Sequence, residues 1–337
     1  MSTPAQARPS GKAPAISPAD LLTPFTWQRR HLTDSAQLTR PEVEEILRTA
    51  QTFAGILNRP VKKVPTLQGK VVVNMFYENS TRTLTSFELA AKYLSAETIN
   101  FSVGASSIKK GESLLDTAET LRAMGVDAVV MRHPHSGAAH QLARYYGDRV
   151  AVVNAGDGCH DHPTQGLLDL YSLTQRLESL EGQKIVIVGD ILHSRVARSN
   201  IAMLKLFGAD VHVVGPATLL PPEVGALGCT VHTRIQPALQ DADVVMCLRM
   251  QMERQTLGLI PPLGEYSRLY CITQERLDTH CKPDVLVMHP GPMNRGVEID
   301  SAVADNVDHS LITNQVTSGV AIRMAVLYLL MTQPGKV

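Results

Sequence analysis

Two kinds of hydrophobic segment alternate along this chain, and the alternation predicts the fold class. Short apolar or β-branched runs, typical of buried strands, lie at 70–76, 97–102, 127–131, 149–153, 184–188, 210–214, 229–232, 243–248 and 284–288. Between them the apolar residues recur at helical spacing, as they also do from Pro41 to Asn58, before the first run. Strands that alternate with helices form parallel sheets covered by helices on both faces. The pattern therefore predicts an α/β protein built from doubly wound sheets.

The length of 337 residues accommodates two domains of about 150 residues each. We place the join near the loop 156–165, which a long helix over 164–178 should follow. The division predicts a first domain over 21–162 and a second domain over 163–317. Residues 1–20 are rich in Pro, Ala and Ser, and we expect them to form a flexible arm.

Charge and aromatic content exclude two classes of partner. Basic and acidic residues balance at 32 each, so no global field attracts nucleic acid or a membrane surface. Only 4% of the residues are aromatic, which argues against stacking on single-stranded nucleic acid. Five cysteines form no C-x-x-C pair, the N-terminus lacks the apolar core of a signal peptide, and no apolar stretch is long enough to span a bilayer. We therefore expect a cytoplasmic protein with reduced thiols.

A phosphate-binding segment is predicted where the run 70–76 gives way to a helical pattern at 83–94. Ser80, Thr81, Arg82 and Thr83 lie at this junction. A helix start offers unpaired backbone N–H groups and the positive end of the peptide dipoles. The hydroxyls and the guanidinium add donors and a full charge. The alternative is an ordinary helix cap followed by a surface arginine.

Arg195 marks a second strand end. The glycine fingerprint of dinucleotide-binding proteins needs three glycines at this point, whereas only Gly189 is present, which argues against a nicotinamide cofactor. Arg132 follows another predicted strand, and Arg249 and Gln251 follow a third. Because positions i and i+2 share a face in an extended stretch, the last pair suits a carboxylate. Each of these arginines, taken alone, is also typical of a solvated surface.

Two loops add neutral groups to the predicted site. The loop from Asn154 to Gln165 has two glycines and a Pro163 able to open a helix, which would turn His162 and Gln165 toward a cleft. His160-Asp161-His162 beside Cys159 also permits a metal site or a helix-capping histidine, although no distant ligand pair completes a metal set. The loop at 289–292 is rigid and projects backbone carbonyls.

The predicted site contains cations but no nucleophile, no Ser/His/Asp set and no paired carboxylates. This composition suits one kind of reaction. Such a site favours two anionic substrates that are joined directly, through orientation and electrostatic stabilisation. A polar loop that begins at Ser106 contains two adjacent lysines, of which Lys110 is one. On its own, such a pair is typical of solvated surface.

From about Thr33 to Leu330 the chain resembles the catalytic chains of the aspartate transcarbamoylase family. The resemblance rests on F-x-x-x-S-T-R-T, K-K-G-E, M-R-H-P, N-A-G-D-G-x-x-x-H-P-T-Q, R-x-Q and H-P-G-P-x-N-R-G. The sister ornithine transcarbamoylases carry cysteine in the last loop, where this chain has Pro290. The resemblance implies transfer of a carbamoyl group from carbamoyl phosphate to L-aspartate, an early step of pyrimidine biosynthesis, without metal or cofactor. It also implies that the last helix, 318–332, crosses back to the first domain.

The resemblance assigns roles to individual residues. It implies a carbamoyl-phosphate site made of Ser80, Thr81, Arg82, Thr83, Arg132, His162, Gln165, Pro290 and Gly291. Among these, Thr83, Arg132 and His162 would polarise the carbamoyl oxygen. Aspartate would bind Lys110, Arg195, Arg249 and Gln251. Ser106 and Lys110 would come from the neighbouring subunit of a homotrimer.

Three alternatives stay open at this point. A different transcarbamoylase would use the same phosphate site with another amine. A paralogue without activity could serve only as a scaffold for dihydroorotase. Extended arms occur in bacterial relatives that assemble with dihydroorotase or dihydroorotase-like chains, but residues 1–20 could equally be a disordered tail without a role.

Overall fold

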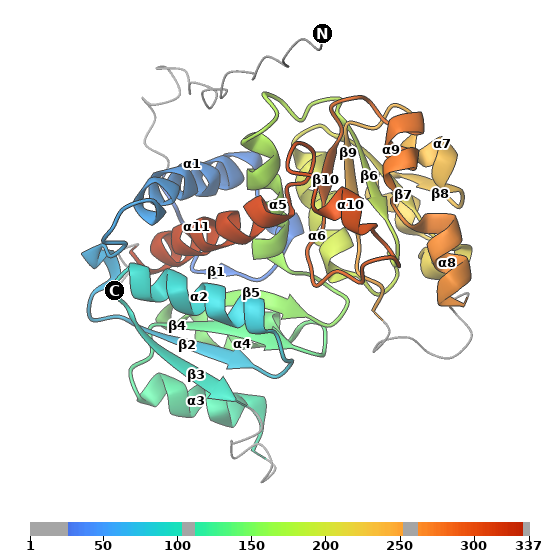
Figure 1. The fold of residues 1–337 in the computed structure, drawn as a ribbon. Helices are drawn as coiled ribbons and strands as arrows, with labels where there is room; N and C mark the ends of the chain where they lie inside the picture. The colour runs from blue at the N-terminus through green and yellow to red at the C-terminus, as the bar shows by residue number, and fades with distance from the viewer. Residues whose placement is uncertain (1–25, 103–111, 252–261, 333–337) are drawn as a thin grey trace.

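Two parallel five-stranded sheets, each covered by helices, lie side by side in the molecule (Figure 1). They are seen in a computed structural model that describes residues 26–102, 112–251 and 262–332. The arrangement confirms the prediction of an α/β protein with two doubly wound domains. Within these ranges, no helix combines the length and the apolar character that crossing a bilayer demands.

The first sheet has the strand order β1-β5-β4-β2-β3, with every neighbouring pair parallel. Its strands are β1 (His31–Leu32), β2 (Val71–Phe76), β3 (Glu97–Ser102), β4 (Ala128–His133) and β5 (Ala151–Asp157). The apolar runs predicted the start of four of them to within two residues. Strand β1 was not predicted, because two residues carry no periodic pattern, and only pairing with β5 makes them a strand.

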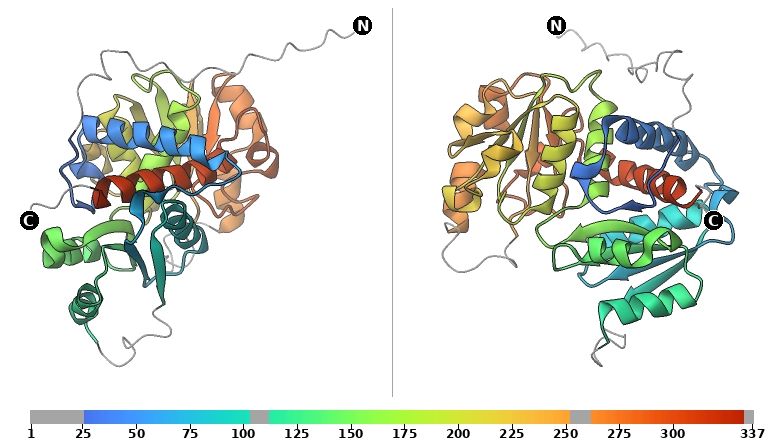
Figure 2. Two further views of the ribbon diagram at one scale, coloured as in Figure 1. Left: turned by 90° about the vertical axis from the view of Figure 1, so that its left-hand side faces the viewer. Right: turned by 180° about the vertical axis from the view of Figure 1, so that it is seen from behind.

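Helices cover both faces of this sheet (Figures 1 and 2). They are α1 (Arg40–Leu57), α2 (Thr81–Tyr93), α3 (Leu114–Ala123) and α4 (Ala138–Tyr146). Helix α1 buries Val43, Ile46, Ala50 and Phe53, which follow the spacing of one helical face. The predicted helix at 41–58 is therefore confirmed.

The second sheet has the order β10-β9-β6-β7-β8 and is also parallel throughout. Its strands are β6 (Lys184–Val188), β7 (Asp210–Val214), β8 (Thr230–His232), β9 (Val244–Cys247) and β10 (Leu286–Met288). The helices of this half are α6 (Arg195–Leu206), α7 (Ile235–Leu239), α8 (Leu263–Tyr270), α9 (Gln274–His280) and α10 (Ser301–Ala304).

Helices α5 (Pro163–Thr174) and α11 (Ile312–Met331) join the two halves. Helix α11 packs against α1, α2 and α5, so the last helix does cross back to the first domain (Figure 2). It begins at Ile312 rather than at residue 318. Apolar residues surround most of it, as expected for a helix buried on all sides. The boundary between residues 162 and 163 stays a prediction.

The strand order of each sheet reverses once. The chain runs from β2 to β3 on one side and returns to β4 on the other side of β2; likewise β9 and β10 lie across β6 from β7 and β8. Ligands of open α/β sheets bind at such reversals, beyond the carboxyl ends of the strands. The carboxyl ends of the strands in the two sheets face each other across the space between the domains.

Candidate active site

A cavity of about 560 Å³ lies between the two domains at the strand reversals. Every predicted site residue within the described ranges lines it, namely Ser80, Thr81, Arg82, Thr83, Arg132, His162, Gln165, Arg195, Arg249, Gln251, Pro290 and Gly291. The predicted residues Ser106 and Lys110 lie outside the described ranges. The cavity therefore brings together predicted residues that are up to about two hundred positions apart in the chain.

The start of α2 forms one wall of the cavity. Ser80 is the N-cap, yet its side chain makes no capping hydrogen bond, so the hydroxyl is left for another partner. Arg82 lies against Gly291 of the second domain, so closely that a methyl group added to Gly291 would overlap Arg82 Nη1. Gly291 also has φ +63°, a conformation that favours glycine. Burial, with a smaller effect of nearby Arg249, lowers the pKa of Arg82.

A single carboxylate connects cations of the two domains. Glu78 Oε1 accepts hydrogen bonds from Arg132 Nη2 at 2.7 Å and from Arg195 Nη2 at 2.6 Å. Arg132 also donates to the Ala155 carbonyl, and Arg195 to the Gly158 carbonyl. Both guanidiniums are thereby held in fixed positions at the cavity wall.

His162 is the N-cap of α5, with Pro163 at the first helical position as predicted. Its backbone N–H donates to Asp161 Oδ1 and Ser199 Oγ, both at 2.8 Å. Burial, followed by the charges of nearby arginines, holds the pKa of His162 well below its usual range, so the ring is neutral at pH 7. Its Nδ1 is buried without a hydrogen-bond partner among the described residues, as expected for a group that awaits a ligand.

Gln165 is oriented by a buried carboxylate. Its Nε2 donates to Asp169 Oδ1 at 2.9 Å, which leaves the amide oxygen as the group that can accept from a ligand. Asp169 also accepts from Asn200 in α6 and Gln315 in α11. Burial raises the pKa of Asp169 to about 6 in spite of these donors. Helices from both halves of the molecule therefore meet at one carboxyl group.

The loop after β10 is fixed by the same network. Gln315 Oε1 accepts from the backbone N–H of His289 at 3.0 Å, and the Gly291 N–H donates to His289 Nδ1 at 2.7 Å. His289 Nε2 therefore carries the proton and lies 3.1 Å from Glu298 Oε1. These contacts hold the backbone of Pro290 and Gly291 at the cavity.

The cavity residues that were not predicted as site residues include Glu78, His289, Gln315 and Arg323. Glu78 lies inside the F-x-x-x-S-T-R-T motif, and His289 opens the H-P-G-P motif, so their positions were a usable signal. Arg323 was visible as a charge within the apolar stretch before Met331. Burial lowers its pKa to about 9, and its guanidinium lies 5.0 Å from the Phe87 ring centre.

The metal interpretation of residues 159–162 is not supported by how these side chains lie. The Asp161 carboxylate accepts hydrogen bonds from Ser35 and Ser199, and the His162 ring lines the cavity instead of turning toward Asp161. His160 contacts a different carboxylate, that of Asp157.

Comparison with known proteins agrees with this geometry. The family model of the aspartate/ornithine carbamoyltransferase carbamoyl-phosphate-binding domain matches residues 30–175, and that of the Asp/Orn-binding domain matches residues 181–330. The aspartate carbamoyltransferase catalytic subunit of Desulforudis audaxviator is 60% identical, over 90% of this chain and 97% of its own length. That of Thermosynechococcus vestitus is 55% identical, over 94% and 98%.

Solved structures show the same fold. Aspartate transcarbamoylase from Trypanosoma cruzi, in complex with carbamoyl aspartate and phosphate, has a TM-score of 0.80 at 29% identity, covering 91% of this chain and 98% of its own. Ornithine carbamoyltransferase from Pyrococcus furiosus has a TM-score of 0.79 at 27% identity, covering 92% and 99%. The chain belongs to the aspartate/ornithine carbamoyltransferase family, and its high-identity relatives are aspartate carbamoyltransferase catalytic subunits.

Proposed function

We propose that the chain transfers the carbamoyl group of carbamoyl phosphate to the amine of L-aspartate, which gives N-carbamoyl-L-aspartate and phosphate, an early step of de novo pyrimidine biosynthesis. The observation that carries this proposal is the charge of the cavity. Among the described residues that line it are five arginines and a single carboxylate, Glu78. Such a surface suits substrates that together carry a phosphate and two carboxylates.

Carbamoyl phosphate is proposed to bind at the start of α2. Its phosphate would accept hydrogen bonds from the backbone and side chains of Ser80, Thr81, Arg82 and Thr83, and from Arg132. The carbamoyl oxygen would lie against Thr83, Arg132 and the neutral ring of His162. The amide oxygen of Gln165 and the carbonyls of Pro290 and Gly291 would accept from the carbamoyl NH₂ group. The Gln165–Asp169 hydrogen bond supports this assignment, because it turns the Gln165 oxygen toward the ligand.

Aspartate is proposed to bind on the side of the second domain, with its carboxylates on Arg195, Arg249 and Gln251. Lys110, which lies outside the described residues, is expected to contribute as well. Arg195 and Arg249 follow adjacent strands of the second sheet and line the same cavity. Glu78, which already holds Arg195, fixes the position in which that guanidinium meets the substrate.

The reaction then needs orientation and charge stabilisation rather than a protein nucleophile. The neutral amine of aspartate attacks the carbamoyl carbon, a C–N bond forms, and the carbonyl oxygen gains negative charge. Thr83, Arg132 and His162 stabilise that charge. The bond from the carbon to the phosphate oxygen then breaks, and the departing phosphate takes the proton of the amine.

The first experiment measures product formation by the purified chain with carbamoyl phosphate and either L-aspartate or L-ornithine. Carbamoylaspartate formation, with no turnover of ornithine, is the expected result. Turnover with ornithine alone would keep the phosphate site and overturn the role of Arg249. Arg249→Lys offers a sharper form of the test: because lysine cannot hold a carboxylate in a bidentate contact, KM for aspartate should rise while binding of carbamoyl phosphate persists.

We further propose a homotrimer in which Ser106 and Lys110 of each chain complete the site of its neighbour. The support is the matching loop motif, of which Ser106 and Lys110 lie outside the described ranges. Mixing inactive Arg82→Ala chains with inactive Lys110→Ala chains should restore activity through repaired shared sites. Absence of recovery after verified subunit exchange would contradict the proposal.

Two proposals concern the setting of the enzyme. We infer that it works in the cytoplasm, which cell fractionation can test. We also infer an assembly with dihydroorotase or a dihydroorotase-like chain through residues 1–20. Deleting residues 1–20 should abolish co-purification of that chain, and an unchanged assembly mass would leave the arm without this role.

A further inference from the structure

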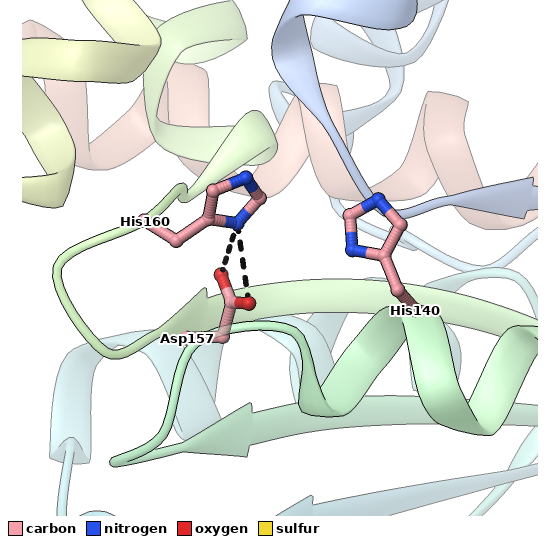
Figure 3. Close-up of side chains that lie close together, drawn as sticks. All are labelled: His140, Asp157 and His160. Carbon is pink, nitrogen blue, oxygen red and sulfur yellow. Dashed lines mark hydrogen bonds and ion pairs between the residues drawn. The ribbon is translucent and has the colours of Figure 1, made fainter.

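Three side chains outside the cavity form a group with the chemistry of a metal site (Figure 3). His140 lies on α4, Asp157 ends β5, and His160 lies in the loop that leads to α5. One ligand atom from each of the three lies within 4.8 Å of the others. We call these three residues the His140 cluster. The metal site considered from the sequence grouped His160 with Asp161, His162 and Cys159, and it did not include His140, which lies twenty positions away.

Asp157 is held rigidly in this cluster. His160 Nδ1 lies 3.1 and 3.2 Å from its two oxygens. Its carboxylate also accepts from Asn154 Nδ2 at 2.8 Å and from the backbone N–H groups of Asp161 and Gly137 at 3.2 and 2.6 Å. A ligand fixed in this way loses little freedom when it binds an ion.

A second carboxylate lies behind the two histidines. Asp34 Oδ2 lies 3.8 Å from Nε2 of His140 and 3.7 Å from Nε2 of His160. Histidines that bind metals almost always present their other ring nitrogen to a carboxylate or a carbonyl, which fixes the ring and its tautomer. At these distances Asp34 is slightly beyond hydrogen-bond reach of both rings, and a small shift would let it do this for either of them.

The charge count favours a cation. Two carboxylates face two imidazoles, so the group carries about two negative charges when both rings are neutral. The side chains of Asp34, His140 and His160 are 20, 25 and 34% exposed, which leaves an ion a path from solution. The rings lie at 65° to each other with centres 5.5 Å apart, and their edges face a shared space (Figure 3).

We propose that the His140 cluster binds a divalent first-row transition metal of the zinc type, with a ring nitrogen of each histidine and a carboxylate oxygen of Asp157 as ligands. Imidazole and carboxylate suit Zn²⁺, Co²⁺ and Ni²⁺, and solvent supplies the remaining ligand. Tetrahedral bonds of about 2.0–2.1 Å place ligand atoms roughly 3.3 Å apart. The His140 ring must therefore rotate slightly, so that its nitrogen comes closer to the other two ligand atoms. The ion would join α4 to the loop that carries His162.

The test is titration of metal-free wild-type protein, without an affinity tag, with Zn²⁺ by calorimetry and with Co²⁺ by visible absorption. We expect one site per chain, and binding at least tenfold weaker in His140→Asn and in His160→Asn. Asp34→Asn should weaken binding by a similar factor, which covers the case in which a ligand variant fails to fold. Far-UV circular dichroism before metal addition identifies such a failure.

Two control variants address other side chains that could bind the same ions. The adjacent rings of His212 and His232, 2.8 Å apart between nitrogens, could bind the same ions, so His212→Asn should leave the measured site unchanged. Cys159→Ser should also leave it unchanged, because Cys159 is not part of the cluster. Binding that survives in His140→Asn, binding that is lost in His212→Asn, or absence of saturable binding would overturn the proposal. None of these readouts depends on carbamoyl transfer.

Discussion

Glu78 and Arg195 form a charged contact between the two domains at the cavity, with 2.6 Å between Oε1 and Nη2. The same oxygen holds Arg132 of the first domain at 2.7 Å. Neutralising Glu78 removes the carboxylate that both nearly buried guanidiniums contact. Such a loss is strongly destabilising in a dry interior, but the Glu78 side chain is 26% exposed, which reduces the cost.

We therefore predict that Glu78→Gln lowers the free energy of unfolding by about 1–2 kcal/mol. Phosphate should restore more stability to the variant than it adds to the wild type, because the anion replaces the missing charge. Thermal unfolding with and without phosphate measures both effects. Glu88→Gln removes a carboxylate that pairs with Lys92 on the exposed side of α2, and it should show neither effect. Equal phosphate shifts in Glu78→Gln and in the wild type would contradict the bridging role.

The contact between Arg82 and Gly291 predicts a second effect. In Gly291→Ala the new methyl group would overlap Arg82 Nη1 and would strain a backbone at φ +63°. Because Arg82 must move, we expect KM for carbamoyl phosphate to rise by roughly tenfold or more, the value of one charge-assisted hydrogen bond. Gly264→Ala is the matched control, since a methyl group at Gly264 meets nothing within 4 Å. An unchanged KM in Gly291→Ala would contradict the predicted displacement of Arg82 from the phosphate.

The sequence predicted much of this site because its chemistry lies at strand ends. Runs of apolar residues locate the buried parallel strands, and the first cationic or hydroxyl residues after them fall at the edge where such sheets bind ligands. Arg132, Arg195 and Arg249 were found in this way. Which arginine serves which substrate came from family resemblance and stays a prediction.

What escaped prediction depends on tertiary packing. The burial of Arg323 follows from the packing of α11 against α1, α2 and α5. In the sequence, Asp169 is a polar residue within a largely apolar helix. Only the fold brings the side chains of Gln165, Asn200 and Gln315 to it. His140 and His160 are twenty positions apart on different elements, with no spacing rule that links them.

His162 is the residue whose loss should act on turnover rather than on substrate binding. In the proposed mechanism its neutral ring stabilises charge that develops on the carbamoyl oxygen in the transition state, so His162→Ala should lower kcat by about 10²–10³. KM for carbamoyl phosphate should change much less, because the phosphate contacts remain. Steady-state kinetics separate the two quantities. His280→Ala in α9, outside the cavity, should change neither kcat nor KM. A large rise in KM with little change in kcat would make His162 a binding residue instead.

The Asp169 carboxyl group should make stability depend on pH in an identifiable direction. Its pKa is about 6 in the folded protein and near 3.8 in an unfolded chain, because burial disfavours the charge. The folded state therefore binds this proton more tightly, and the group's stabilising contribution is fully present below pH 3.8 and lost as pH rises through 6. Relative to Asp169→Asn, the wild type should gain about 2 kcal/mol of unfolding free energy between pH 7.5 and 4.5.

Urea unfolding of both proteins at several pH values measures this difference. In the asparagine variant the side-chain oxygen can still accept from Gln165 and Gln315, whereas Asn200 must flip and give up its hydrogen bond to the Val196 carbonyl before its Oδ1 accepts from the new amide. That cost does not depend on pH, so the pH dependence of the difference still reports on Asp169. Asp305→Asn supplies a control, since the hydrogen bond from Arg295 lowers the pKa of Asp305 below 3.8; its contribution is lost only at lower pH, and its difference from the wild type should stay nearly constant between pH 7.5 and 4.5. If the difference between wild type and Asp169→Asn stays constant over this pH range, then Asp169 is ionised throughout. The three amides around it would then be sufficient to hold a buried charge.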